Sequence, residues 1–430
     1  MLRREKGLCE EHLCVRLNAP VLVCLPIAVL ERVRDRTSAI VILIRRQQML
    51  DSRSKPSLIV SATGEPVADS ARRKPQARSA RRRLLFLAMY CVYLVGLGWL
   101  AVRGYYWIRY DVGVVSHQLT TDELWRIHFP KLHTSGVESK PLGRDDGHFD
   151  VLLLGASVME QVADRLESQL RDEMGDRLRV YNLCTAAHTT RDSYWKFTRL
   201  AEKDFDLIVV YHGINDARMN CCRPNEFRED YTHCGHYAAI QKQLVGGDVT
   251  VTELALQEFG RLIPLGSPKP EMLEFGRTIK TANAFRTNVE SIVRAAQSRQ
   301  RPVLLMTFAY HLPANYSHAK FQQHELDYGE GQYEMEAEVW GRPEYLRATI
   351  DAHNREIRRL ASEYKNVILI DQLDLMPSEG RYFSDPCHLT DEGCRRFVTN
   401  MLPGIQRAAG LLVADSPSSQ TGHPDSSANN

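Results

Sequence analysis

The sequence predicts an α/β domain with a mostly parallel five-stranded sheet, preceded by one membrane-spanning helix. Three observations predict this fold: short apolar runs recur from residue 150 onwards, longer amphipathic segments separate them, and one charge-free apolar segment precedes them all. Strands that alternate with helices favour a parallel sheet, because a crossover between parallel strands needs a connection as long as a helix. The five expected strands are 150–154, 178–183, 206–211, 302–307 and 366–370.

Amphipathic segments of helical length follow these runs. In the first of them, 159–174, apolar residues share one face at Val162, Leu166 and Leu170. The domain is therefore expected over 150–410, with helices on both faces of the sheet. The tail 411–430 is rich in Ser, Asp and Asn and is expected to be disordered. The other expected helices are 191–202, 277–298, 345–364 and 391–409.

The segment 84–102 contains no charged residue and is long enough to cross the roughly 30 Å core of a bilayer. A cluster of Arg and Lys lies before it, between residues 72 and 83, and the aromatic run Tyr105, Tyr106 and Trp107 follows it. By the positive-inside rule the N-terminus is cytoplasmic and the large C-terminal part extracytoplasmic, on the periplasmic face of the inner membrane in a bacterium. We expect an uncleaved anchor rather than a signal peptide, because the run is long and no small-x-small site follows it.

Residues 1–83 are expected to form a largely disordered cytoplasmic tail. The part before Met49 is either such a tail or a mis-called start, because Met49 is itself followed by a polar segment, the basic cluster and the anchor. The segment 103–149 is expected to be a linker between the anchor and the domain. The net charge of +2 is too small to indicate a nucleic-acid partner.

Six of the 10 cysteines follow the anchor and can form disulfides in an oxidising compartment. The expected pair is Cys222 with Cys234, which bracket a short polar loop. Cys221 and His236 could join these two as zinc ligands, but the spacing is not that of a standard zinc site. No metal is expected there or at the scattered His311, His318 and His324, and no cofactor is expected at all. The remaining three of these cysteines are Cys184, Cys387 and Cys394.

Two insertions, at about 218–274 and 311–343, follow the third and fourth expected strands. Ligands of open α/β sheets bind at the carboxyl ends of the strands, near the switch in strand order. Since both insertions leave the sheet at that edge, we expect them to form walls or a lid over a site.

Three short motifs whose residues could take part in catalysis stand at the ends of expected strands. Ser157, in Gly155-Ala156-Ser157, begins a helix, where free backbone N–H groups and the helix dipole favour negative charge; the alternative is an N-cap serine. Asp385 and His388, in one Asp-Pro-Cys-His loop, could supply the carboxylate and the base that a hydrolytic serine needs; the alternative is a capping loop around Asp391.

The third motif is Gly213-Ile214-Asn215-Asp216. The Asn215 amide can point an N–H group toward the strand end that carries Ser157 and stabilise the negative oxygen of a tetrahedral intermediate. An ordinary Gly/Asn/Asp turn is the alternative. The occurrence of all three motifs in order, each at a strand end, favours the chemical interpretation.

These motifs, in this order, resemble the SGNH (GDSL-like) hydrolase family over roughly 150–409. The resemblance implies a flavodoxin-like three-layer sandwich and metal-independent ester hydrolysis through an acyl-enzyme. It makes Ser157 the nucleophile, Asp385 and His388 the acid–base pair, and Asn215 the side-chain donor of the oxyanion hole. Gly155, Gly213 and Asp216 are supporting residues of the motifs.

Two positions depart from the family pattern. Ala156 stands where the family name has Asp, a position that varies. Ala187 stands where the family has a glycine whose backbone N–H joins that of Ser157 in the oxyanion hole. Alanine keeps the N–H group but lacks the freedom of glycine to adopt positive φ or to let substrate approach closely.

The sequence as a whole predicts a membrane-anchored extracytoplasmic serine esterase that acts on a lipid or an acylated carbohydrate. An O-acyltransferase that moves an acyl group to or from an envelope glycan would use the same residues. A non-catalytic binding module with the same fold is a third possibility, because fold alone does not establish function.

Overall fold

The computed structural model describes residues 12–16, 22–26, 77–110, 118–142, 146–246, 249–261 and 267–410. The chain divides into two compact units, residues 1–95 and 96–430. In the first unit, β1 (His12–Arg16) and β2 (Leu22–Pro26) form an antiparallel pair within the segment expected to be a largely disordered tail. The expected tail 411–430 and the region around Met49 lie outside the described residues.

The second unit is built on a five-stranded sheet in the order β4-β3-β5-β6-β7, with every pair parallel. This is the flavodoxin-like order, in which the chain runs from the first strand outward to one side and then to the other. Each strand falls where the sequence predicts one. The strands are β3 (Phe149–Gly155), β4 (Leu178–Asn182), β5 (Leu207–Tyr211), β6 (Val303–Met306) and β7 (Val367–Ile370).

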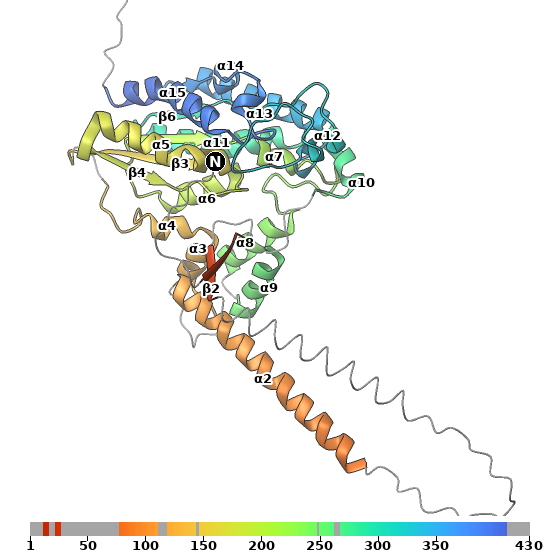
Figure 1. Ribbon diagram of the computed structural model, residues 1–430. Coiled ribbons are helices and arrows are strands. Elements are labelled where there is room, and N and C mark those ends of the chain that lie inside the picture. The colour runs from red at the N-terminus through yellow and green to blue at the C-terminus, as the bar shows by residue number, and fades with distance from the viewer. Residues whose placement is uncertain are drawn as a thin grey trace, which may run out of the picture. The chain divides into compact units, whose positions relative to one another are not determined.

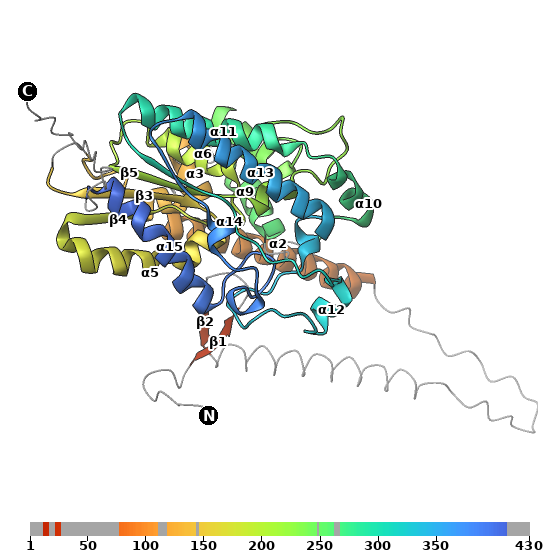
Figure 2. The ribbon, with the colours of Figure 1, turned by 90° about the horizontal axis from the view of Figure 1, so that it is seen from above.

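Helices cover both faces of this sheet, as Figures 1 and 2 show. Side chains of β3 alternate between the two faces: Val151 and Leu153 join one apolar core, Leu152 and Leu154 the other. The first core is covered by α5 (Ser157–Met174) and α15 (Asp391–Ala408). The second is covered by α6 (Thr190–Arg199), α11 (Thr281–Ser298) and the C-terminal half of α13 (Pro343–Glu363).

The segment 103–149 is more than a linker, contrary to the expectation. It contains α3 (Thr121–His128) and α4 (Pro130–Thr134). Thr120 and Glu123 form a capping box at the start of α3, which satisfies two otherwise free N–H groups. Leu124 and Ile127 of α3 are buried. Capping and burial together explain why this stretch folds.

The first insertion forms helices that pack on this N-terminal segment, so the expectation that they cover the site is wrong. These helices are α8 (Gly235–Gly246) and α9 (Val251–Arg261). Val251 and Leu254 of α9 share a small apolar core with Leu124 of α3 and with Tyr106 at the end of α2 (Ala77–Tyr110). The apolar faces of α3 and α9 bury one another here, whereas Tyr237 and Ile240 of α8 join the apolar core on one face of the sheet.

Shorter elements complete the described part of the chain. They are η1 (Gly175–Arg177), α7 (Ile214–Arg218), α10 (Pro270–Leu273), η2 (Glu274–Arg277), α12 (His318–Gln322), η3 (Ala337–Val339), α14 (Gln372–Leu375) and η4 (Gly380–Tyr382).

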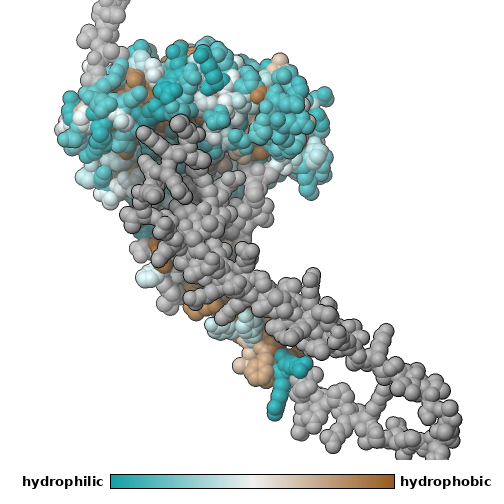
Figure 3. Space-filling view, in the orientation of Figure 1, coloured by the Kyte–Doolittle hydropathy of each residue, from teal (hydrophilic) through white to brown (hydrophobic). Residues whose placement is uncertain are grey.

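Helix α2 contains one stretch, Arg82–Ile108, that is long and apolar enough to cross a membrane by length and composition. Its apolar side chains are exposed, Leu84 by 73% and Val92 by 72%. On the face shown in Figure 3 the surface of the sheet-containing domain is mostly hydrophilic, whereas α2 carries hydrophobic side chains. The helix is thus a candidate for the anchor expected at 84–102.

The expected Cys222–Cys234 disulfide is wrong. Both residues are free thiols, as are Cys91, Cys184, Cys221, Cys387 and Cys394. Cys222 is buried and its Sγ points to the backbone oxygen of Met219, at 3.5 Å. Bracketing a short loop in sequence therefore did not bring the two sulfur atoms together.

Candidate active site

The turn from β3 into α5 presents Ser157. Gly155 ends β3, and a Cβ there would lie 2.7 Å from the Cβ of Met159, so only glycine fits. Ala156 occupies the N-cap position and makes no side-chain cap. Ser157 is therefore the first residue of the helix and not its N-cap, which removes the alternative interpretation. Its side chain is free to bond elsewhere.

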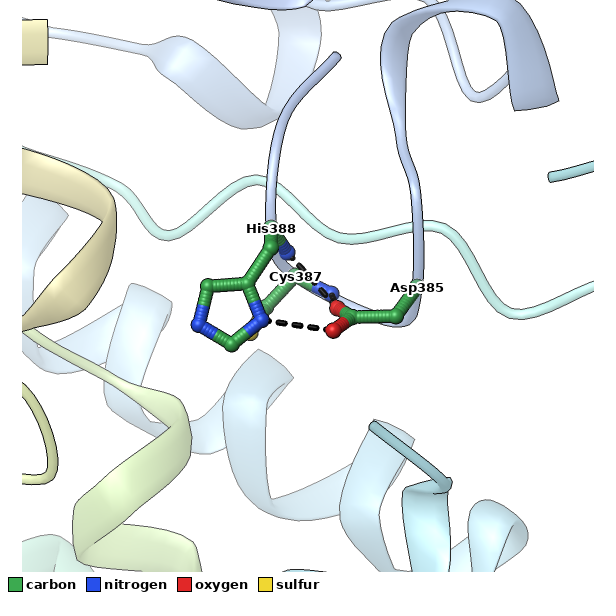
Figure 4. Close-up of side chains that lie close together, drawn as sticks. All are labelled: Asp385, Cys387 and His388. Carbon is green, nitrogen blue, oxygen red and sulfur yellow. Dashed lines mark hydrogen bonds and ion pairs between the residues drawn. The ribbon is translucent and has the colours of Figure 1, made fainter. Parts of the chain in front are cut away.

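Ser157, His388 and Asp385 form a hydrogen-bonded relay. Ser157 Oγ lies 2.8 Å from His388 Nε2, and His388 Nδ1 lies 2.6 Å from Asp385 Oδ2. Figure 4 shows Asp385 and His388 facing each other across their shared loop. When Nδ1–H donates to the carboxylate, Nε2 is left as an acceptor for the serine hydroxyl. All three residues are less than a tenth exposed.

The Asp385 carboxylate is held by three backbone N–H groups besides the imidazole. Oδ1 accepts from Cys387 and from His388, at 2.9 and 2.8 Å, and Oδ2 accepts from Met335 at 3.0 Å. This arrangement is a local Asx-type turn and not a helix cap, because Thr390 caps α15. The carboxylate is thereby fixed in the orientation that the imidazole requires.

Ala187 lies in the loop between β4 and α6 with a φ of 63°. This is the left-handed region, which costs an L residue roughly 1–2 kcal/mol and favours glycine. The chain thus departs from the glycine expected here in residue type but keeps a glycine-like backbone.

Asn215 is held at both ends of its amide. Its Oδ1 accepts the indole N–H of Trp340 at 2.9 Å, and its Nδ2 donates to the backbone oxygen of His188 at 3.0 Å. Because an indole nitrogen only donates, the orientation of the amide is unambiguous. Nδ2 carries a second N–H group, and Asn215 lines the same small cavity as Ser157.

A family model decides the class of protein. The model of the GDSL-like Lipase/Acylhydrolase family matches residues 153–396, which include Ser157, Asn215, Asp385 and His388. This chain is a member of the GDSL-like lipase/acylhydrolase family. A search of the curated proteins found no match.

Several solved structures of GDSL-like hydrolases and esterases are similar to this chain. A GDSL-like lipase from Bacteroides thetaiotaomicron is 13% identical, with 65% of this chain and 97% of that chain covered and a TM-score of 0.37. An acetylxylan esterase from Geobacillus stearothermophilus is 14% identical, with 60% and 94% covered and a TM-score of 0.34. A lipase/acylhydrolase from Enterococcus faecalis is 15% identical, with 60% and 96% covered and a TM-score of 0.33. At these identities and TM-scores the likenesses say nothing of substrate.

In this GDSL-like hydrolase the supporting residues of the motifs have packing roles. A Cβ at Gly213 would lie 2.5 Å from the Phe308 ring, so a larger residue would displace the turn that carries Asn215. Asp216 is fully buried and accepts hydrogen bonds from Thr190 and Tyr231. Burial raises the pKa of Asp216 to about 7. It anchors the start of α6 behind the site.

The second insertion packs against the candidate catalytic residues. The Tyr333 ring stacks on the His388 ring at 4.5 Å between centroids, and Ser384 Oγ donates to the Tyr333 backbone oxygen at 2.8 Å. Trp340 and Met335, which contact Asn215 and Asp385, belong to the same segment. The sequence motifs do not reveal these three residues, because their contacts depend on how the insertion folds back.

The cavity beside Ser157 has a volume of about 10 Å³. That is room for roughly one water molecule and not for an acyl group. The cavity is lined by Ala156, Ser157, Val158, Tyr211, His212, Gly213, Ile214, Asn215 and Phe308.

Cys387 adjoins the relay, with its Sγ 3.6 Å from His388 Nδ1. Asp385, Cys387 and His388 could together hold a metal ion, since their ligand atoms lie within 4.8 Å of one another. Burial, and next the Asp385 carboxylate, raises the pKa of the Cys387 thiol well above its usual range. His388 Nδ1 already bonds the Asp385 carboxylate, so the geometry suits the serine relay better than a metal.

A second buried serine–histidine pair makes no hydrogen bond to this relay, although His212 lines the same cavity as Ser157. Ser193 Oγ is 2.7 Å from His212 Nε2. His212 Nδ1 has no hydrogen-bond partner, so no carboxylate orients this imidazole. The pair lacks the third member that a relay needs and provides a natural control for Ser157.

Proposed function

We propose that this protein is a membrane-anchored serine esterase that cleaves a carboxylic ester through an acyl-enzyme. The observation that carries the proposal is the relay from Ser157 through His388 to Asp385. A serine hydroxyl is a weak nucleophile until a base takes its proton, and the base needs a carboxylate to hold its tautomer. The base lies within hydrogen-bonding distance of the serine, and the carboxylate within hydrogen-bonding distance of the base.

In the proposed reaction His388 Nε2 takes the proton of Ser157 Oγ as the oxygen attacks the ester carbonyl carbon. Asp385 stabilises the imidazolium that forms. His388 then gives the proton to the leaving alcohol, and the acyl group remains on Ser157. Water, deprotonated by the same imidazole, releases the acid and restores the serine.

The negative oxygen of each tetrahedral intermediate would be received by three donors. Two are the backbone N–H groups of Ser157, at the start of α5, and of Ala187. The third is the free N–H of Asn215 Nδ2. Donors fixed before the reaction stabilise developing charge without reorganisation, and this is often the largest single contribution to catalysis.

The second insertion would act as a cover that moves aside for the ester. Its contacts with the relay exclude water, which strengthens the electrostatic interactions beneath it. An acylated carbohydrate or a lipid is the expected substrate class. No bound cofactor takes part in the proposed steps.

Turnover of an ester series by the full-length protein in detergent tests this proposal. Ser157→Ala should lose nearly all hydrolysis of 4-nitrophenyl esters, whereas Ser193→Ala, in the matched buried pair, should keep it. Hydrolysis that survives in Ser157→Ala would reject the serine mechanism. Added glycan acceptors that collect the acyl group in place of water would reassign the enzyme as an O-acyltransferase.

We further propose that α2 anchors the enzyme with its domain outside the cytoplasm. The basic cluster before the apolar stretch and the aromatic residues after it support this orientation. The domain should remain with the membrane fraction, and protease added to intact spheroplasts should degrade it. Protection until the cells are lysed would reverse the orientation.

A further inference from the structure

The loop that carries Ala187 is tied down by an ion pair. Lys131, on α4, donates from Nζ to the Cys184 backbone oxygen and, at 2.7 Å, to Glu160 Oε1. The other oxygen of Glu160 accepts the backbone N–H of Ala186 at 3.1 Å. The ion pair therefore holds the loop by two hydrogen bonds, at Cys184 and at Ala186, which are three residues and one residue before Ala187.

Glu160 stands one turn after Ser157 on α5. The same carboxylate thus connects the helix that supplies one proposed oxyanion donor, the Ser157 N–H, to the loop that supplies another, the Ala187 N–H. Lys131 and Glu160 side chains are only 30% and 27% exposed, so solvent screens their interaction less than it screens a surface pair.

The positive φ of Ala187 explains why the loop needs these hydrogen bonds. Glycine would adopt this conformation without strain, but alanine holds it only if the surroundings over-determine it. Lys131 lies outside the residues 153–396 that match the family model. It belongs to the segment that follows α2 and lies before the first motif of the matched region.

We propose that Lys131 is a positioning residue of the active site, which acts through Glu160 and the Cys184 carbonyl to hold the Ala187 N–H in the oxyanion hole. The segment between α2 and the sheet then completes the site, besides connecting it to the anchor. This inference rests on the proposed esterase function.

Lys131→Met and Glu160→Gln, in the full-length protein in detergent, test the inference. Loss of a whole oxyanion donor costs on the order of 10²–10³ in kcat, so a displaced donor should cost about tenfold, with little change in KM. The two changes should not be additive, because they break one unit. Lys131→Arg, which keeps the charge and the donors, should restore most of kcat.

Arg199→Met is the matched control. Arg199 ties the same N-terminal segment to the domain through Asp122 and Glu138, at 2.7 and 3.0 Å, with no contact to the loop. It should leave kcat within twofold of wild type. Glu160→Gln leaves α4 intact, so it decides the outcome if Lys131→Met does not fold.

The two proposals fail in different ways. An inactive wild type would reject the esterase function itself. An active wild type with unchanged kcat in Glu160→Gln and Lys131→Met would overturn the positioning role alone. A kcat loss in Arg199→Met equal to that in Lys131→Met would also overturn it, because loosening of the segment would then be the cause.

Discussion

Trp340 donates its indole N–H to Oδ1 of Asn215 at 2.9 Å, and this bond, together with that from Nδ2 to the His188 backbone oxygen, fixes the orientation of the amide beside the cavity at Ser157. Without it, only the bond from Nδ2 to the His188 backbone oxygen would keep the amide from turning and presenting an oxygen where the proposed mechanism needs a donor. Trp340, in the second insertion, therefore helps to orient the side-chain amide of Asn215, although the two residues are far apart in sequence.

Trp340→Phe tests this relationship, because phenylalanine keeps an aromatic ring but removes the N–H group. We expect kcat to fall about tenfold at nearly constant KM, since only part of the stabilisation from one oxyanion donor is lost. Trp125→Phe, which changes an indole on α3 outside the site, should leave kcat unchanged. Equal activity of Trp340→Phe and wild type would contradict the orienting role.

Asn215→Ala removes the side-chain donor but leaves the relay of Ser157 intact. The expected loss is on the order of 10²–10³ in kcat, or about 3–4 kcal/mol, with only a small change in KM. Steady-state kinetics on an activated acetyl ester measures both constants. A loss confined to KM would instead make Asn215 a substrate-binding residue.

Ala187→Gly should raise the free energy of unfolding by up to about 1 kcal/mol. The left-handed conformation costs alanine roughly 1–2 kcal/mol, and the added entropy of glycine in the unfolded chain takes back about 0.5–1 kcal/mol. Loss of the Cβ should also raise turnover of bulkier acyl groups. Ala186→Gly, next in sequence and without positive φ, should destabilise the protein; stabilisation by both changes would exclude relief of strain at Ala187 as the cause.

His353 makes the fold sensitive to acid. Burial lowers its pKa from 6.5 to about 3, and the neutral ring bonds Gly213 and Thr281. A lowered histidine pKa means that the unfolded chain binds the extra proton, so its contribution to stability is present above pH 6.5 and is lost as the pH falls toward 3. Between pH 7 and 5 this loss amounts to about 2 kcal/mol.

Urea unfolding of His353→Gln at pH 7 and pH 5 checks this prediction. The variant should be less stable than wild type at pH 7. From pH 7 to pH 5, however, its free energy of unfolding should fall by about 2 kcal/mol less than that of wild type. The pKa of Asp216, which burial raises to about 7, acts in the opposite direction in both proteins and cancels in the comparison. If wild type and His353→Gln lose the same free energy of unfolding between pH 7 and pH 5, His353 does not cause this pH dependence.

The sheet, its helices and the approximate position of Ser157 could be predicted because each depends on local pattern. Buried parallel strands are short apolar runs, and the three motifs stand at their carboxyl ends. Asp385 and His388 are three residues apart, so a single turn brings them together. The left-handed backbone at Ala187 is one of the two reasons for which a glycine was expected there, the other being close approach of substrate.

What the sequence did not predict depends on long-range packing. The helices α3 and α4 were missed because they are short and bury their apolar residues against α8 and α9 and the sheet domain, not within a repeating pattern of their own. The contacts of Tyr333 and Trp340 depend on how a long insertion folds back. The failed disulfide shows the same limit, since spacing along the chain does not fix the distance between two sulfur atoms.

The central claim is that Ser157 is the nucleophile, and mass-spectrometric mapping of a fluorophosphonate adduct tests it most directly. The full-length protein, labelled in detergent and digested, should carry the adduct on the peptide that contains Ser157. His388→Ala should label far more slowly, because the base that activates the serine is gone. An adduct on another serine, or an active wild-type enzyme that gains no adduct at Ser157, would contradict the account.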